Sequence, residues 1–171
     1  MRLVRLTQDY NITTFDCGDA DLNAFLIEDA KGAIEKRVAK TLIIEDEGKI
    51  VAYCSLLNDR ISRQDVTNSQ WKKIRERFPA SKQFRSYPCV KIGRLAVSKD
   101  YRGLHIGTQM IDTIRTLLEE NDSYSAFRFL TVDAYISAVG FYESMGFLKL
   151  TRKEEDEHTR LMYFDMLELA P

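Results

Sequence analysis

The sequence contains little of what cross-linked and metal-bound proteins need. Its 171 residues include two histidines and three cysteines, Cys17, Cys54 and Cys89, and no pair of cysteines has a CxxC spacing. An odd cysteine count without that spacing argues against a zinc site and against a disulfide framework. We therefore predict three small, buried thiol side chains, a reducing compartment, namely the cytoplasm, and no bound metal.

Long apolar runs are also absent. No apolar stretch approaches the ~18 residues that a membrane-spanning helix requires, and residues 1–6 alternate as a strand does instead of forming an apolar signal region. Repeats, low-complexity tracts and Gly/Ser linkers are missing too. The chain is expected to be soluble, without a membrane partner, and to form one domain over residues 1–171.

Charge is nearly balanced overall but unevenly placed. The formal net charge is −1, whereas residues 60–94 carry ten basic and two acidic side chains, a net of +8. Such a segment could attract a polyanionic ligand or substrate. The alternative to a ligand-binding role is a helix over residues 69–78 whose cationic face is simply exposed to solvent. The basic residues are Arg60, Arg63, Lys72, Lys73, Arg75, Arg77, Lys82, Arg85, Lys91 and Arg94.

The hydrophobic pattern alternates between strand and helix periods. Strands are expected at residues 2–7, 41–45, 49–57, 89–97, 127–134, 147–151 and 161–167. Helices are expected from an N-cap at Asp19 or Asp21 to residue 34, around Trp71, over residues 106–118 and around Tyr142. A mixed sheet covered by helices is the natural packing for this order. The acidic run at residues 154–157 is expected to be a solvated turn between two strands.

The most informative stretch is a loop that joins a strand to an amphipathic helix. Residues 102–108 read RGLHIGT, and apolar residues then recur with a helical period at Ile106, Met110, Ile111, Ile114, Leu117 and Leu118. Unpaired backbone N–H groups at a helix start, together with the positive end of its dipole, suit a phosphate or pyrophosphate. A tight turn with no ligand is the alternative that this spacing leaves open.

The strand before this loop changes phase beside a glycine. Its apolar alternation runs through Val90 and Ile92, misses Arg94, and resumes at Leu95 and Val97. A one-residue slip at Gly93 is typical of a β-bulge, which can part a strand from its neighbour next to an active site. The main-chain groups of a parted strand need other partners, and an extended amide-bearing ligand could supply them.

Two segments carry a resemblance to a known family. The sequences IGRLAVSKDYRGLHIGTQMI and VDAYISAVGFYESMGF resemble the acyl-CoA-binding core of the GNAT superfamily of N-acyltransferases, closely over residues 88–150. The resemblance implies an α/β fold with a mostly antiparallel, twisted mixed sheet, a splayed and bulged middle strand, and helices on both faces. It also implies acetyl-CoA as the acyl donor.

The resemblance further implies which residues hold the donor. The pantetheine arm would lie along Leu95, Ala96 and Val97, and the pyrophosphate would lie over Arg102, Gly103, Leu104, His105, Ile106, Gly107 and Thr108. The family loop pattern is Q/R-x-x-G-x-G/A, which Arg102 and Gly107 fit, whereas His105 replaces the first glycine. Histidine is acceptable there if its φ is positive, because it is one of the non-glycine residues enriched in that region.

A tyrosine is the candidate catalytic residue. Tyr142 occupies the FY position of the family pattern FYxxxGF, on the same helix face as Ala138, Phe141 and Met145, and Gly146 follows where a C-terminal cap is expected. A phenol that is neutral near pH 7 can protonate the departing thiolate as a general acid. The alternative is a core tyrosine whose hydroxyl is bonded to a backbone carbonyl.

The N-terminal segment carries a weaker resemblance. FDCGDADLNAFL, residues 15–26, resembles the opening of a GNAT branch that includes bacterial toxin acetyltransferases acting on aminoacyl-tRNA. The leading hypothesis is therefore acetyl transfer from acetyl-CoA to a primary amine, the acceptor being a small molecule or a peptide. Transfer to aminoacyl-tRNA and an acyl-CoA sensor without turnover are the alternatives. The overall acidity disfavours tRNA, a homodimer is left open, and Asp59 is the candidate base, acting through water.

Overall fold

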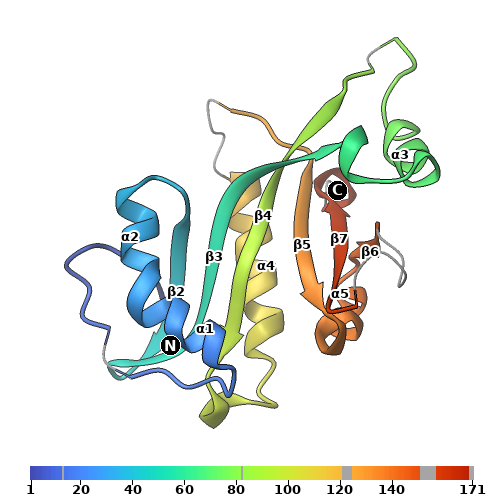
Figure 1. Ribbon diagram of the computed structural model, residues 1–171. Coiled ribbons are helices and arrows are strands. Elements are labelled where there is room, and N and C mark those ends of the chain that lie inside the picture. Colours follow the sequence, from blue (N-terminus) through green and yellow to red (C-terminus); the bar gives the residue numbers. More distant parts are fainter. Residues whose placement is uncertain (13, 82, 121–124, 151–156, 170–171) are drawn as a thin grey trace. The chain divides into compact units, whose positions relative to one another are not determined.

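The computed structural model describes residues 1–12, 14–81, 83–120, 125–150 and 157–169 (Figure 1). Within these residues, seven strands form a sheet in the order β1-β2-β3-β4-β5-β7-β6. The chain divides into two compact units, Met1–Leu57 with Ile92–Asp122, and Asn58–Lys91 with Ser123–Pro171. Two strands, β3 (Lys49–Ser62) and β4 (Ser86–Val97), run through both units. The expected mixed α/β class is confirmed.

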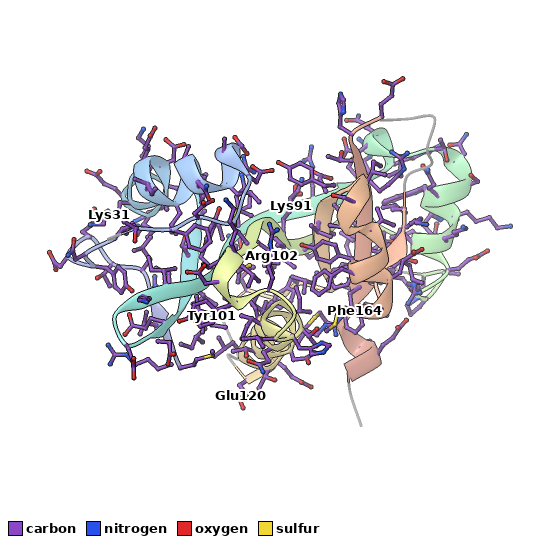
Figure 2. The ribbon with its side chains drawn as sticks, turned by 90° about the horizontal axis from the view of Figure 1, so that it is seen from below. Lys31, Lys91, Tyr101, Arg102, Glu120 and Phe164 are labelled. Carbon is purple, nitrogen blue, oxygen red and sulfur yellow. The ribbon has the colours of Figure 1, made fainter. Side chains whose placement is uncertain are left out.

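The first unit is built on an antiparallel meander. β1 (Arg2–Arg5) pairs with β2 (Lys40–Asp46), which pairs with β3 across the turn at Glu47 and Gly48, both of which have positive φ. The helical segments before β2 cover one face of these strands, and α4 (Ile106–Glu120) covers the other (Figures 1 and 2). Helices thus cover both faces of these strands, as expected (Figures 1 and 2).

The helix expected from Asp19 to residue 34 forms, but it is not continuous. Asp19 is its N-cap, and the Asp19 carboxylate accepts a hydrogen bond of 3.0 Å from the Leu22 amide. The helix then runs through α1 (Ala20–Ala24), a π-helical segment η1 (Phe25–Asp29) and α2 (Ala30–Glu35). A π-helical turn contains about one residue more than an α-helical turn. The spacing of apolar residues in this sequence does not predict such a turn.

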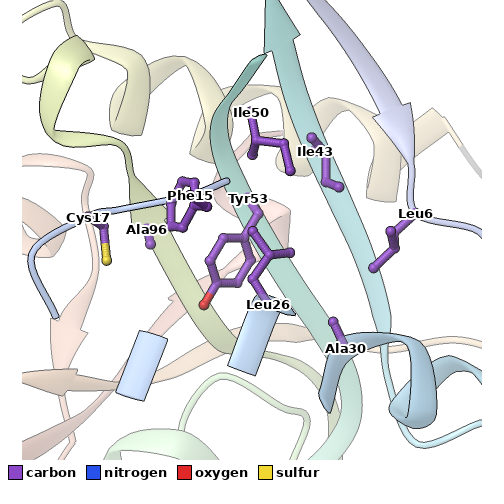
Figure 3. Close-up of a cluster of buried hydrophobic side chains, with 9 residues drawn as sticks. All are labelled: Leu6, Phe15, Cys17, Leu26, Ala30, Ile43, Ile50, Tyr53 and Ala96. Atoms are coloured by element: carbon purple, nitrogen blue, oxygen red, sulfur yellow. The ribbon is translucent and has the colours of Figure 1, made fainter. Parts of the chain in front are cut away.

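The core of the first unit joins these elements. Its buried side chains are Leu6, Phe15, Cys17, Leu26, Ala30, Ile43, Ile50, Tyr53 and Ala96 (Figure 3). The Tyr53 ring lies 5.4 Å from the Phe15 ring and 6.1 Å from the Phe25 ring, and the Tyr53 hydroxyl donates a 2.7 Å hydrogen bond to the Leu22 carbonyl. Phe15 and Cys17 therefore hold the N-terminal segment against β3 and β4.

The second unit packs around aromatic side chains. α3 (Asn68–Arg75) begins with a capping box between Thr67 and Gln70, and the strands are β5 (Phe129–Tyr135), β6 (Leu148–Lys149) and β7 (Thr159–Asp165). β5 and β6 each pair antiparallel with β7. The short helix α5 (Val139–Ser144) follows β5. The core of this unit comprises Ile61, Trp71, Ile74, Tyr87, Cys89, Phe129, Leu150 and Tyr163.

Element boundaries differ from the expected ones mainly at strand ends. β1 ends at Arg5 rather than at residue 7, β3 extends to Ser62, and the strand expected at residues 147–151 is reduced to two residues. The last strand ends at Asp165, after which residues 166–169 form a helical turn. Most of the acidic run 154–157 lies outside the described residues. No helix in the described ranges is long and apolar enough to cross a membrane.

All three cysteines are buried and free, as predicted. Burial raises the pKa of Cys54 and raises the pKa of Cys89 to about 12. Thiols whose pKa lies this high remain protonated near neutral pH, so they act as small apolar side chains.

One buried carboxylate organises the polar side of the second unit. Asp165 is 3% exposed and accepts hydrogen bonds of 2.6 and 2.9 Å from Arg128 and of 2.7 Å from Arg77. Burial alone would raise the pKa of Asp165, but the hydrogen bonds from Arg128 and Arg77 outweigh it and hold that pKa below its usual range. Two guanidinium groups from distant parts of the sequence thereby converge on the end of β7.

We expect Asp165→Asn to lower the free energy of unfolding by about 3 kcal/mol, because two half-buried cations lose their counter-charge. Urea unfolding would measure this difference. It should be constant from about pH 7 to pH 5, begin to shrink near the unfolded-state pKa of about 3.9, and vanish as the pH falls through the folded-state pKa. Glu168→Gln, which removes the exposed partner of Arg77, should cost less than about 1 kcal/mol. Equal stability of Asp165→Asn and the wild type would contradict this account.

Candidate functional site

The loop after β4 has the backbone that the sequence predicts. Ser98 donates its N–H to the Val51 carbonyl at 2.8 Å, and the short 3-10 helix η3 (Lys99–Tyr101) follows. Gly103 has φ +78° and His105 has φ +56°, and α4 begins at the next residue. The condition under which histidine can take the place of the family's glycine, a positive φ, is met at His105.

The amides of this loop lack backbone partners in the part of the chain that the structure describes. Among the residues that the structure describes, no backbone hydrogen bond is made by the N–H groups of residues 103–108, and the first donor in this part of α4 is Gln109, which reaches the His105 carbonyl at 3.0 Å. The first N–H groups of any helix lack an intrahelical acceptor. Six neighbouring donors at the positive end of a 15-residue helix are an arrangement that favours an anion.

The side chain of Arg102 does not extend freely over the loop. Its Nη2 donates a short hydrogen bond to the carbonyl of Cys17, 85 residues away in sequence. A Cβ atom on Gly18 would lie 3.1 Å from this Nη2 and 3.0 Å from Cε of Lys99, so the Arg102 and Lys99 side chains are packed over a glycine. The sequence indicates Arg102 as a cofactor ligand and gives no sign of this contact. Figure 2 shows Arg102 where the chain enters α4.

A second set of contacts holds the start of the same loop. Lys99 Nζ lies 2.7 Å from the Asp16 carboxylate, and the Lys99 N–H donates to the Asp16 carbonyl at 2.9 Å. Asp16 also accepts hydrogen bonds from the Gly18 N–H at 2.8 Å and from the Asn23 amide at 3.1 Å. The hydrogen bonds from Lys99, Gly18 and Asn23 lower the pKa of Asp16 to about 2. The residues of the motif FDCGD are thus the missed components of this site.

The three strand residues expected along the pantetheine arm lie just before the loop. Ala96 is buried against Phe15 and Tyr53, whereas Leu95 and Val97 are half-buried (Figure 3). At Gly93, an added Cβ would lie 2.7 Å from Cδ2 of Leu57, so a larger residue would have to displace the end of that side chain on β3. The bulge expected beside Gly93 stays a prediction.

Arg94 is a further residue of this strand that sequence reasoning did not assign. Its guanidinium carbon lies 5.3 Å from the centre of the Phe25 ring, and its Nε is 3.5 Å from the Asp21 carboxylate. Arg94 also donates a 2.9 Å hydrogen bond to the carbonyl of Gly93. A half-buried cation is thereby fixed beside Leu95, between β4 and the first helix.

Tyr142 lies on α5 in the second unit. Its side chain is 5% exposed, and its ring lies 5.1 Å from the Phe141 ring and 5.3 Å from the Phe147 ring in edge-on contacts. The Tyr142 carbonyl accepts the N–H groups of Met145 and Phe147, which closes the helix before Gly146 at φ +81°. The expected C-terminal glycine is confirmed, and the helix end fixes the Tyr142 ring.

Asp59, the candidate base, has a partner. Lys91 Nζ lies 3.6 Å from the Asp59 carboxylate and 2.5 Å from the Asp133 carboxylate, on the three consecutive strands β3, β4 and β5. Burial would lower the pKa of Lys91, but the hydrogen bond and charge of Asp133 and the charge of Asp59 outweigh it and raise that pKa. Because the Asp59 carboxylate is already paired with this cation, the arrangement disfavours Asp59 as the base.

The basic segment is less cationic in space than in sequence. Arg77 is paired with Asp165 and Glu168, and Lys91 is paired with Asp59 and Asp133. The side chains of the segment that remain exposed in the second unit are Arg60, Arg63, Lys72, Lys73, Arg75 and Arg85. Within the described ranges, no cluster of three or more His, Cys, Asp or Glu side chains is arranged to hold a metal.

A family comparison covers most of the chain. The model of the family described as "Acetyltransferase (GNAT) family" matches residues 5–147. This match begins at the last residue of β1 and extends past the end of α5, and so includes the loop, the first helix and Tyr142.

Solved structures with the same fold include bacterial toxins. A tyrosine-to-phenylalanine mutant of KacT is 24% identical, with a TM-score of 0.76 over 99% of this chain and 98% of that one. AtaT complexed with acetyl-methionyl-tRNAfMet is 22% identical, with a TM-score of 0.76 over 98% and 97%. AtaTR bound with AcCoA is 21% identical, with a TM-score of 0.76 over 98% and 95%. At these identities the likeness establishes the fold.

The left-handed residue at the centre of the loop gives a direct test. Because His105 has φ +56°, His105→Gly should leave the free energy of unfolding unchanged or raise it, whereas β-branched His105→Val should lower it by about 1–2 kcal/mol. Gln109→Gly, in the first turn of α4, should instead lower it by about 1 kcal/mol because glycine costs backbone entropy in a helix. Denaturant unfolding compares the three variants, and a loss in His105→Gly as large as that in Gln109→Gly would refute the assigned backbone.

Proposed function

Because the chain belongs to the acetyltransferase (GNAT) family, we propose that it transfers an acetyl group from acetyl-CoA to a primary amine by direct attack. The observation that carries this proposal is the row of unpartnered amides at residues 103–108, before α4. No side chain of the protein fills the acceptor role there among the described residues, so the donors are available to a ligand. Oxygen atoms of a pyrophosphate match them in charge and number.

Each part of the donor has a proposed set of residues. The pyrophosphate would be held by the amides of residues 103–108, and the pantetheine arm by the main chain of Leu95, Ala96 and Val97. The thioester supplies an activated carbonyl carbon. A backbone amide near Leu95 to Val97 would stabilise the negative charge that develops on the carbonyl oxygen in the tetrahedral intermediate.

Tyr142 is the proposed general acid. The acceptor nitrogen forms a bond to the acetyl carbon, the carbon–sulfur bond breaks, and the phenol gives its proton to the departing sulfur. The ring contacts with Phe141 and Phe147 support this role because they hold the phenol in one orientation. The proton lost by the acceptor amine passes to solvent, and the phenol is reprotonated from solvent.

Aminoacyl-tRNA is the second candidate acceptor. It is supported by the likeness to AtaT complexed with acetyl-methionyl-tRNAfMet and by the FDCGD segment. Phe84 also supports it, since this ring is 60% exposed, lies edge-on 6.1 Å from Tyr87 and is followed by the exposed Arg85. Exposed rings among cations are a platform on which unpaired bases stack. The net charge of −1 and the ion pairs of Arg77 and Lys91 weigh against it.

An acyl-CoA sensor without turnover is the third candidate. It would keep the amides of the loop and liberate no thiol from acetyl-CoA. A single acyltransferase domain over residues 1–171, a cytoplasmic location and a homodimer stay predictions.

Replacing the phenol tests the catalytic proposal. Tyr142→Phe should lower the rate of thiol release from acetyl-CoA about 100-fold or more, because a general acid contributes at least that factor, while the Kd for acetyl-CoA changes less than about twofold. Thiol release should be followed across polyamines, amino acids, peptides and charged tRNA, with binding measured by calorimetry. Tyr10→Phe, which removes a phenol bonded to Glu45 at 2.7 Å, is the matched control with wild-type turnover. Full activity of Tyr142→Phe would eliminate the proposed acid.

Growth and salt dependence separate the two acceptors. If aminoacyl-tRNA is the acceptor, induced expression should arrest growth, and Tyr142→Phe should relieve the arrest. Phe84→Ala should then raise the KM for charged tRNA about tenfold, because it removes the stabilisation from one base stacked on the ring. The KM for acetyl-CoA should not change. Normal growth on expression, together with turnover of small amines, would favour the first candidate.

A further inference from the structure

We propose that the side chain of Arg102 is a positioning group, which fixes the 102–108 loop through the carbonyl of Cys17 and does not itself contact the pyrophosphate. This inference rests on the proposed function, since it concerns how the loop is prepared for acetyl-CoA. The FDCGD segment, residues 15–19, would then assist donor binding indirectly, by positioning the loop that binds the donor.

Contacts with the N-terminal segment hold both ends of the turn formed by residues 99–102, which leads into the loop. At one end, the Lys99 N–H and Nζ both bind Asp16, at 2.9 Å to its carbonyl and 2.7 Å to its carboxylate. At the other end, the Arg102 guanidinium binds the carbonyl of Cys17. Residues 99 and 102 are the two ends of this turn, so two consecutive residues of the N-terminal segment determine the direction in which the chain enters Gly103.

The N-terminal segment is itself held firmly enough to serve this purpose. Phe15 is 6% exposed and packs edge-on against Tyr53, and the Cys17 N–H donates a 2.9 Å hydrogen bond to the Asn23 side chain. Asn23 returns a hydrogen bond of 3.1 Å to Asp16. A segment anchored in the core and bonded to the first helix can transmit that rigidity to the loop.

The loop needs such support because its conformation is unfavourable when unsupported. Gly103 and His105 both have positive φ, and the six N–H groups of residues 103–108 make no backbone hydrogen bond within the described ranges. A free chain would leave this state to pair its amides, and a ligand would then have to restore it at a cost in affinity. Fixing Arg102 to the protein reduces that cost before the ligand arrives.

Gly18 provides the sharpest substitution. A methyl group there would meet Lys99 Cε at 3.0 Å and Arg102 Nη2 at 3.1 Å, so it must displace the ends of these two side chains. Gly48 has nearly the same backbone, φ +78° against φ +84°, and nothing lies within 4 Å of its Cβ position. Gly18→Ala and Gly48→Ala therefore both place alanine at a positive φ. Only Gly18→Ala also brings a methyl group into close contact with the Arg102 side chain.

The experiment measures by calorimetry the Kd of acetyl-CoA and of S-acetyl-pantetheine, which lacks the pyrophosphate, for the wild type, Arg102→Met, Gly18→Ala and Gly48→Ala. Arg102→Met and Gly18→Ala should weaken acetyl-CoA about tenfold, the equivalent of one hydrogen bond to a charged group, and leave acetyl-pantetheine unchanged. Gly48→Ala should bind both ligands as the wild type does. The salt dependence of acetyl-CoA binding should be the same in Arg102→Met as in the wild type.

Each other outcome has a distinct meaning. Wild-type protein that binds no acetyl-CoA would overturn the proposed function, and the inference with it. If the wild type binds but Gly18→Ala matches Gly48→Ala, the positioning role is wrong. A weaker salt dependence in Arg102→Met, with unchanged affinity in Gly18→Ala, would show instead that the guanidinium contacts the phosphates directly. Equal losses for both ligands would also overturn the inference, since they would indicate a general distortion.

Discussion

The need of backbone N–H groups for an acceptor is the constraint on which the candidate site depends. Unpaired amides are costly wherever water is excluded, so proteins seldom gather six of them in a row. Here residues 103–108 do so because Gly103 and His105 adopt left-handed backbone, and because the first turn of α4 has no preceding residues to bond. The strand before the loop, the helix after it and the N-terminal segment beside it all serve to keep these donors in place.

The parts of this site that the sequence predicts are those encoded by neighbouring residues. The RGLHIGT spacing, the apolar period of α4 and the FYxxxGF helix each depend on contacts within a few positions, so their structure follows from local rules. The condition placed on His105, that histidine fits this position if its φ is positive, is the clearest case, since it depends on one residue type at one position of a pattern. The mixed α/β class and the helices on both faces followed from the resemblance and from the alternation of elements, whereas the order of the strands within the sheet was not predicted.

The parts that could not be predicted are pairings between residues far apart in the chain. Nothing in the sequence connects Arg102 to Cys17, or Asp165 to Arg77 and Arg128, because such contacts depend on packing that only the folded chain defines. Charge counted along a segment misleads for the same reason, since Arg77 and Lys91 are neutralised by carboxylates outside the segment 60–94. The π-helical turn at Phe25–Asp29 is a similar case, because it interrupts a pattern that reads as one regular helix.

The pairing of the carboxylates bears on which amine the protein can use. Asp59 and Asp133 face Lys91, Asp21 faces Arg94, and Asp16 faces Lys99, so each of these four groups is committed to a cation. An alkyl amine with a pKa of about 10.4 is neutral in roughly 1 molecule in 2,500 near pH 7, and it needs a base to react. An α-amino group with a pKa of about 7.7–8.0 is neutral in roughly 1 molecule in 5–10. Under the proposed function, the α-amino group of an amino acid, a peptide or an aminoacyl ester would therefore need less help from a base than an alkyl amine would.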